Sequence, residues 1–274
     1  MTDLGYPARL LGTMPESQKA GTPPIVLTIA GFDPSSGAGI TADLKTIAAH
    51  GCYGVACITA LTVQSTQGVF RVEPVSPDLV VQTLSELAGD VDFAAIRIGM
   101  LGSAEVAEAV ASFLSSRRAK NVVLDPVIRS SSGADLLDPE GVGFMRKWLL
   151  PLAAVVTPNM DEAESLTGMS VRSLEEMKAA AEHLQRMGAR AVVITGGHLP
   201  ENTDLLRLNS GEELEFTSPR IDSTSTHGTG CAFATSLACN LALGKEMKEA
   251  VGKAKEYVGK AIAAAYPVGQ GKGP

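Results

Sequence analysis

The sequence has few cysteines, fewer basic than acidic residues and no long apolar run. Its four cysteines, Cys52, Cys57, Cys231 and Cys239, form no C-x-x-C pair and are too few for a disulfide scaffold in a chain of this size. Lysine and arginine number 23 against 30 acidic residues, and the net charge is -7. Such a chain repels phosphate backbones and anionic lipid, so neither a nucleic acid nor a membrane is expected as a partner.

The first 24 residues carry four prolines and three glycines and show no sustained periodicity. They also lack the apolar stretch of a secretory signal, so a cytoplasmic location is expected. Two stretches free of Asp, Glu, Lys and Arg, 46–70 and 223–244, are interrupted by polar residues and glycine, which argues against a membrane span. We therefore predict a mobile arm over residues 1–24 and a single folded domain over residues 25–274.

Short apolar segments alternate with amphipathic segments along the chain. Hydrophobic residues make up 45% of it and charged residues 19%, so a sizeable core can be buried. The expected strands are 25–30, 55–60, 94–98, 121–124, 153–157 and 191–195, and the expected helices are 40–50, 78–87, 104–116, 139–150, 173–187, 229–243 and 248–265. The segments 205–209 and 214–217 predict an antiparallel hairpin at a sheet edge. This order predicts an α/β fold with a mainly parallel sheet between helical layers, whose substrates bind beyond the carboxyl ends of the strands.

The segment Thr226-His-Gly-Thr-Gly-Cys231 comes directly before an uncharged helix. Its glycines allow the backbone to approach a ligand, and the first helical turn leaves N–H groups unpaired at the positive end of the helix dipole, which predicts an anion-binding site. Cys231 is expected at the helix start, where the dipole lowers the pKa of a thiol and makes it a candidate base or nucleophile. Alternatively, the glycines serve only tight packing and Cys231 is a small buried apolar residue.

A second glycine-rich loop, residues 31–39, follows the first strand and leads into the helix that carries Asp43. It matches neither the phosphate-binding pattern G-x-x-x-x-G-K-[ST] nor the dinucleotide pattern G-x-G-x-x-G, which disfavours redox chemistry. The end of a first strand is nevertheless where a doubly wound sheet places substrate contacts. The alternative for Asp43 is a carboxylate that only complements the dipole of its helix.

Acidic and amide side chains follow two further strands. Asn159 and Glu162 open a helix at a spacing that lets both reach one point, where they could hold hydrated Mg²⁺, and Asp125 faces the same crevice. Glu162 could equally be an ordinary acid of a first helical turn. The four histidines show no metal-ligand spacing, which argues against zinc. Together with the anion site, these residues favour phosphoryl transfer.

Six motifs occur in a fixed order along the chain, at residues 28–46, 58–64, 98–101, 124–127, 157–159 and 226–231. Over essentially Ile25 to Tyr266, the chain resembles the hydroxymethylpyrimidine/phosphomethylpyrimidine kinases of thiamin biosynthesis, in the ribokinase-like superfamily. The resemblance implies an α/β/α sandwich. It also implies a homodimer that uses ATP and Mg²⁺ to phosphorylate 4-amino-5-hydroxymethyl-2-methylpyrimidine and then its monophosphate.

The resemblance assigns roles to particular residues of this sequence. It makes Cys231 the catalytic residue, beside an anion hole formed by Gly228, Thr229 and Gly230. It places the pyrimidine against Gly31, Asp43, Gln64, Met100 and Val127, with polar contacts from the carboxylate and the amide. It assigns the nucleotide to Asn159, Thr195, Gly197 and His227, and the metal to Glu162 and Asp125.

Two positions depart from the family pattern. Where these kinases commonly have Lys-Gly-Gly-His, this chain has Thr195-Gly-Gly-His198, and Ser131 stands where a lysine commonly precedes Ser-Gly. Arg129 is a candidate to compensate for the missing charge. The missing lysines put the second phosphorylation, that of the monophosphate, in question more than the first.

Two other functions are compatible with these residues. Pyridoxal kinases use a similar site, although Gln64 favours the pyrimidine. A pyrimidine-binding protein that has lost turnover would account for the missing lysines. Such a protein has no need to retain Cys231, Asn159 and Glu162, which argues against it.

Overall fold

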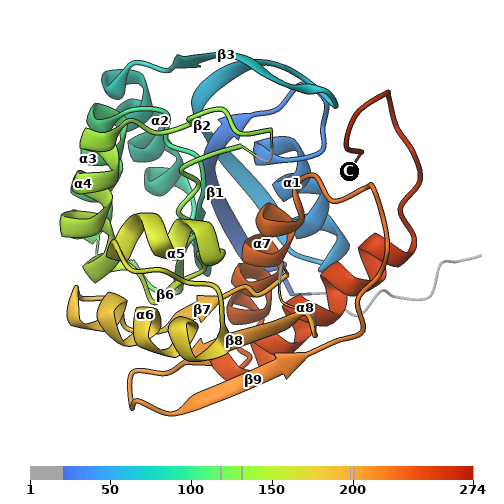
Figure 1. Ribbon diagram of the computed structural model, residues 1–274. Helices are drawn as coiled ribbons and strands as arrows, with labels where there is room; N and C mark the ends of the chain where they lie inside the picture. The colour runs from blue at the N-terminus through green and yellow to red at the C-terminus, as the bar shows by residue number, and fades with distance from the viewer. Residues whose placement is uncertain (1–20, 118, 131, 198, 200, 274) are drawn as a thin grey trace, which may run out of the picture.

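A mixed sheet forms the centre of the structure (Figure 1). The computed structural model describes residues 21–273 except 118, 131, 198 and 200, and within them nine strands lie in the order β3-β2-β1-β4-β5-β6-β7-β8-β9. The strands are β1 (Ile25–Phe32), β2 (Tyr53–Ser65), β3 (Gly68–Pro74), β4 (Ala95–Ile98), β5 (Val122–Leu124), β6 (Val155–Val156), β7 (Val192–Ile194), β8 (Thr203–Arg207) and β9 (Glu213–Thr217). Neighbouring strands from β2 to β7 run parallel, whereas β3, β8 and β9 pair antiparallel at the two edges.

Helices cover both faces of this sheet. One face carries α2 (Pro77–Asp90), α3 (Ala104–Arg117), α4 (Pro139–Phe144), α5 (Met160–Thr167) and α6 (Leu174–Arg186), and the other carries α1 (Gly39–Ala49), α7 (Thr229–Ala242) and α8 (Met247–Ala263). Strand β1 shows why both faces are apolar, because Leu27 and Ile29 pack into the first layer and Val26 packs into the second. All three side chains are fully buried. The structure is therefore a three-layer α/β/α sandwich, which confirms the predicted fold class.

Two elements differ from the sequence prediction. The prediction omits β3 and ends the second strand at residue 60, but β2 continues to Ser65 and turns directly into β3. Strand β3 carries Arg71, Glu73 and a proline, a composition that edge strands tolerate and that hides them from a pattern search. The predicted helix 139–150 is α4 followed by a π-turn (Met145–Leu149) and a 3-10 turn (Leu150–Leu152), because Pro151 cannot continue an α-helix.

The boundaries of the folded part agree with the sequence at its start. Strand β1 begins at Ile25, where the domain is expected to begin, and most of the predicted arm, residues 1–20, lies outside the described residues. None of the helices in the described part of the chain combines the length and the apolar character needed to cross a bilayer.

The parallel strands bring their carboxyl ends to one edge of the sheet. The loops that follow β1, β4, β5, β6 and β7 therefore meet there, and α7 and α5 point their first turns at the same place. This edge is where doubly wound sheets bind their ligands.

Candidate active site

A cavity of about 1230 Å³ lies at this edge of the sheet. The predicted site residues that line it are Gly31, Gln64, Met100, Asp125, Val127, Asn159, Glu162, Thr195, Gly197, His227, Gly228, Thr229, Gly230 and Cys231. Asp43 is the predicted residue that does not line it. The topology thus brings together segments from 31 to 231, which are far apart in the sequence.

The first turn of α7 forms one wall of the cavity. Gly228 precedes it with a φ of 79°, and a Cβ atom there would lie 1.9 Å from the carbonyl oxygen of Gly37. A side chain is excluded on both grounds, so the glycine lets the loop after β1 pack directly against the start of α7. No side chain caps this helix, and a Cβ atom at Gly230 would meet open space. The first-turn N–H groups therefore face the cavity at the positive end of the helix dipole, which is an anion-binding arrangement.

Cys231 lies on this turn, but its thiol does not have the lowered pKa that the helix dipole predicts. Burial raises the pKa of Cys231 to about 11, and the carboxylates of Asp125 and Asp43 also raise it. The guanidinium of Arg97 and the N–H of Gly39 lower it without reversing the shift. Desolvation of the anion is the largest cause, and the direction of the shift is opposite to the lowered pKa that the helix start predicts.

A buried guanidinium lies under the cavity. Nη1 of Arg97 donates to Oδ2 of Asp43 at 2.9 Å, and Nη2 donates to Oδ2 of Asp125 at 2.6 Å. The side chain of Arg97 is fully buried, and its Nε has no hydrogen-bond partner among the described residues. The positive charge of Arg97 also acts on the thiol of Cys231 and lowers its pKa. One cation thus pairs with two carboxylates and influences the predicted catalytic residue.

The position of Asp43 corrects the predicted contact with the pyrimidine. Asp43 has no exposed surface, and its two oxygens accept hydrogen bonds from the hydroxyls of Thr28 and Thr235 at 2.6 and 2.7 Å, besides the one from Arg97. Both oxygens are engaged within the protein and the side chain does not line the cavity, so the carboxylate holds the guanidinium in place instead of meeting a ligand. The alternative of a carboxylate that only complements its helix dipole is wrong as well, because Asp43 lies beyond the first turn of α1 and is bound to three partners.

The sequence analysis missed Arg97, although the sequence carries a signal for it. Strand β4 reads Ala-Ile-Arg-Ile, and all four residues are buried. A charged side chain inside a strand covered on both faces requires a buried partner, since an unpaired charge there is costly. That requirement is met by Asp43 of α1 and by Asp125, which directly follows β5.

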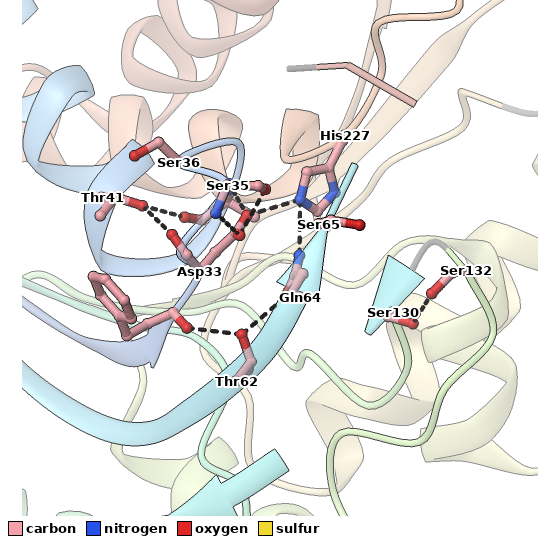
Figure 2. A network of polar contacts seen from close by, with 12 residues as sticks. Asp33, Ser35, Ser36, Thr41, Thr62, Gln64, Ser65, Ser130, Ser132 and His227 are labelled. Atoms are coloured by element: carbon pink, nitrogen blue, oxygen red, sulfur yellow. Dashed lines mark hydrogen bonds and ion pairs between the residues drawn. The ribbon is translucent and has the colours of Figure 1, made fainter. Parts of the chain in front are cut away.

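A polar network lines the cavity beside the first turn of α7 (Figure 2). Oδ2 of Asp33 lies 2.9 Å from Nε2 of His227, and Nε2 of Gln64 lies 3.1 Å from the same nitrogen. Asp33 also accepts hydrogen bonds from the N–H groups of Ser35 and Ala38. Burial alone would raise the pKa of Asp33, but these hydrogen bonds together lower it below its usual value. The network fixes the loop after β1, strand β2 and the loop before α7 relative to one another.

Two buried carboxyl groups face the cavity from β5 and α5. Oε2 of Glu162 accepts a hydrogen bond from the N–H of Asn159, and Oδ1 of Asn159 accepts one from the N–H of Glu162, each at 2.9 Å. This capping box shows that Glu162 is a first-turn acid, and it lines the cavity at the same time. Burial raises the pKa of Glu162 well above its usual value, and the charge of Asp125 adds to the rise.

A divalent cation fits the chemistry of this pair. Within the described residues no group of three or more His, Cys, Asp and Glu side chains could hold a metal by itself. Mg²⁺ in phosphate-handling sites takes one or two carboxylates together with water and phosphate oxygens, so Asp125 and Glu162 are a sufficient protein share. Their mutual repulsion is relieved by a bound cation.

The end of β7 has no lysine, but basic residues reach the cavity from elsewhere. Thr195 donates its N–H to the carbonyl of Pro158, and Lys255 of α8 forms an ion pair with Asp204 at 2.8 Å. Further basic residues of the lining are Arg129, Arg172, Arg220 and Lys272. Two residues of the departing motifs, Ser131 and His198, lie outside the described residues.

A ribokinase-like sandwich with an anion-binding helix start and two buried carboxyl groups at the sheet edge defines a kinase. The family model described as phosphomethylpyrimidine kinase matches residues 33–274. The chain belongs to this family.

The relatives agree with this assignment. A hydroxymethylpyrimidine/phosphomethylpyrimidine kinase of Haemophilus influenzae is 42% identical over 254 residues, which cover 91% of this chain and 94% of the relative. A thiamine biosynthesis bifunctional protein of Geobacter sulfurreducens is 45% identical over 250 residues, and the match spans 91% of this chain but only 51% of that protein.

Solved structures of two kinds of kinase match the fold. A phosphomethylpyrimidine kinase from Clostridium difficile 630 gives a TM-score of 0.78 at 38% identity, covering 87% of this chain and 99% of its own. The pyridoxal kinase from Staphylococcus aureus in complex with AMP-PCP and pyridoxal gives 0.83 at 35% identity, covering 92% of each chain. The fold is therefore shared by enzymes with different substrates.

Replacement of Arg97 by Met should lower the free energy of unfolding at pH 7 by about 3–5 kcal/mol, because two carboxylates remain buried without their cation. The uncompensated carboxyl groups acquire raised pKa values in the folded state, so the loss should be largest at pH 7 and smaller at pH 5, where they are protonated. Urea denaturation at both pH values measures it. Arg71→Met, which removes a pair exposed on β3, is the matched control and should change stability little. An equal loss at pH 5 and pH 7 would contradict the role assigned to Arg97.

Proposed function

We propose that this kinase transfers the γ-phosphoryl group of ATP to the 5-hydroxymethyl group of 4-amino-5-hydroxymethyl-2-methylpyrimidine and then phosphorylates the monophosphate to the diphosphate, in thiamin biosynthesis. The observation that carries the proposal is the meeting of Cys231, the first turn of α7 and the two acids, Asp125 and Glu162, around one cavity. The names of the relatives support the choice of substrate.

The pyrimidine occupies the part of the cavity beside the loop after β1. Gly31, Met100 and Val127 present an apolar surface to the ring, and a Cβ atom at Gly31 would lie 2.8 Å from the sulfur of Met100. Gly31 therefore leaves room for the methionine and the ring together. Gln64 offers an amide to the polar edge of the aminopyrimidine, and its contact with His227 sets the orientation of that amide.

Transfer depends on positioning and on stabilisation of charge. The substrate oxygen forms the new bond to the γ-phosphorus while the bond to the bridging oxygen of ADP breaks, and the hydroxyl proton passes to an oxygen of the transferred phosphoryl group and from there to solvent. The N–H groups after Gly228 stabilise the charge on the transferred group. Because the pKa of Cys231 is raised to about 11, its protonated sulfur orients the hydroxyl and does not remove the proton in advance. The charge of Arg97 acts on the same thiol.

Asn159, Thr195, Gly197 and His227 are proposed to contact the nucleotide, and Asp125 and Glu162 to hold Mg²⁺ together with its phosphates. When bound, Mg²⁺ neutralises charge on the phosphate oxygens. Asp125 lies at the end of β5 and Glu162 at the start of α5, so these two elements position the carboxylates for the cation. The acids and the first turn of α7 line one cavity, which supports a phosphate chain held by a cation-binding pair and an anion-binding turn together.

The pyridoxal kinase alternative rests on the fold similarity with pyridoxal kinases. Gln64 supports the pyrimidine instead. Its amide lines the cavity and can both donate to and accept from the edge of an aminopyrimidine ring, which offers a donor and an acceptor. A binding protein without turnover is disfavoured because Cys231, Asn159 and Glu162 all line the cavity.

We propose a homodimer formed through the β2–β3 hairpin. Beyond Leu61, strand β2 pairs with β3 alone, so this hairpin projects from the rest of the sheet. Leu61, Val63 and Phe70 on it are 50, 58 and 70% exposed, an apolar surface that a second copy would cover. A cytoplasmic location is also proposed, and the free thiols of all four cysteines support it.

The substrate is tested by release of ADP from Mg-ATP with the pyrimidine, its monophosphate or pyridoxal on one enzyme preparation. Both pyrimidines should be turned over, with kcat/KM at least about tenfold above that for pyridoxal, which corresponds to one well-placed hydrogen bond. Turnover of pyridoxal alone would move the assignment to the other kinase. The absence of turnover with all three would favour the binding protein.

Cys231→Ala should lower kcat about 10²-fold and leave KM for the pyrimidine unchanged, because the sulfur acts on the reacting hydroxyl and not on the ring. Cys231→Ser should retain more activity, since a hydroxyl can also orient the substrate. The raised pKa predicts that log kcat of the wild type shows no inflection from this thiol between pH 6 and 9. Cys52→Ala, a buried cysteine outside the cavity lining, is the matched control. An inflection near pH 7 that disappears in Cys231→Ala would show a thiolate base instead.

Glu162→Gln should raise the Mg²⁺ concentration for half-maximal activity about tenfold, because one of two carboxylates loses its charge. Glutamine keeps the acceptor for the N–H of Asn159, so the start of α5 is preserved. Kinetic titration with Mg²⁺ at saturating ATP measures the change. Glu175→Gln, an exposed acid in the first turn of α6, serves as control. An unchanged Mg²⁺ requirement would exclude Glu162 from the metal site.

A further inference from the structure

The chain returns to the cavity after its last helix. The segment Tyr266–Gly273 follows α8 and runs to the turn of the β2–β3 hairpin and to the loop before α7 (Figure 1). At the hairpin, the N–H of Gly271 donates to Oγ1 of Thr66 at 3.2 Å, and Nε2 of Gln67 donates to Oε1 of Gln270 at 3.2 Å. At the loop, the N–H of His227 donates to the carbonyl of Gly273 at 3.1 Å. The segment is therefore attached to two walls of the active site.

Alternate glycines make this attachment possible. A Cβ atom added at Gly269 would lie 2.3 Å from Oγ1 of Thr66, and one added at Gly271 would lie 1.9 Å from the carbonyl oxygen of Thr66. At Gly273 it would lie 3.0 Å from Oγ of Ser225. Every second residue thus lies flat against the protein, because a side chain there would push the segment away. The intervening residues are Gln270, which bonds to the hairpin, and Lys272, which lines the cavity.

The charge of Lys272 is available to a ligand. Among the basic residues of the lining, Arg129, Arg172 and Lys255 are each in an ion pair with a carboxylate. No carboxylate of the described residues lies within ion-pair distance of Lys272 or Arg220. Of these two residues, Lys272 lies between Gly271, which is bound to the hairpin, and Gly273, which is bound to His227. His227 is the residue directly before Gly228 and the anion-binding turn.

We propose that the segment Tyr266–Gly273 is a phosphate-binding element of the active site and that the ammonium group of Lys272 binds phosphoryl oxygens in the cavity. The inference rests on the proposed function. Phosphoryl oxygens have two sources there, the nucleotide and the phosphate of the pyrimidine monophosphate. In either case Lys272 supplies a positive charge that Thr195 does not supply at the end of β7.

The test compares Lys272→Met, Lys272→Arg and the wild type. Equilibrium binding of the pyrimidine, its monophosphate and ADP by calorimetry is combined with KM and kcat from ADP release. Lys272→Met should weaken binding of a phosphorylated ligand about tenfold or more, the loss typical of one hydrogen bond to a charged group, and leave the unphosphorylated pyrimidine unchanged. Lys272→Arg should restore most of the affinity. Weakened binding of the monophosphate alone identifies the substrate phosphate, and weakened binding of ADP identifies the nucleotide; both results support the proposal.

A second variant tests the attachment itself. Gly271→Ala places a Cβ atom against the backbone of Thr66, so it should reproduce the loss of affinity seen in Lys272→Met although the charge is retained. Lys248→Met removes an exposed lysine of α8 outside the cavity lining and should change no binding constant. The proposal is overturned if Lys272→Met binds all three ligands within twofold of the wild type. A wild type that binds phosphorylated ligands through Lys272 but releases no ADP would refute the proposed function and retain this inference.

Discussion

The buried ion cluster of Arg97, Asp43 and Asp125 is the contact on which the site depends. It joins β4 to α1 and to the end of β5, and through the hydroxyl of Thr235 it also reaches α7. A charged cluster under a cavity is costly unless every member is paired, and here each carboxylate has a donor while the cation has two acceptors. Nε of Arg97 is left without a partner among the described residues. The cluster therefore fixes the position of α7, which carries the anion-binding turn, relative to the sheet.

This cluster also determines what Cys231 can do. Burial is the largest cause of the raised pKa of the thiol; the guanidinium of the cluster lowers this pKa without reversing the shift, and the two carboxylates add to the rise. A residue at a helix start is ordinarily expected to ionise more easily, yet the burial that creates a dry site for phosphoryl transfer disfavours the thiolate. Orientation of the hydroxyl is compatible with such a group, because a loose phosphoryl transfer requires little removal of the proton in advance.

Much of the fold could be predicted from the sequence, and of the predicted site residues all but Asp43 line the cavity. Apolar runs such as Ile25–Ala30 and the glycines before Cys231 have local signatures, since burial and close backbone approach each require particular residue types. The error at Asp43 has a different origin. Whether this carboxylate of α1 faces a ligand or a buried cation depends on Arg97 of β4, and no pattern in the sequence around Asp43 carries that information. The segment around Lys272 could not be predicted for a similar reason. In the sequence its glycines indicate only a flexible tail, and the need for glycine follows from the close approach of this segment to Thr66.

The direct packing of Gly228 on Gly37 has a consequence for the order in which the protein folds. Contacts that complete the site span most of the chain, since Asp33 and His227 are 194 residues apart and Asp43 and Thr235 are 192 apart. Such contacts close very long loops, so they form late compared with the neighbouring pairs of β1 with β2 or β8 with β9. During synthesis, the first half of the sheet can assemble before α7 has emerged, but it then has no anion-binding turn. A chain that ends before α7 has the loop after β1 but not the turn that packs on it, so the two walls of the site come from opposite ends of the folded chain.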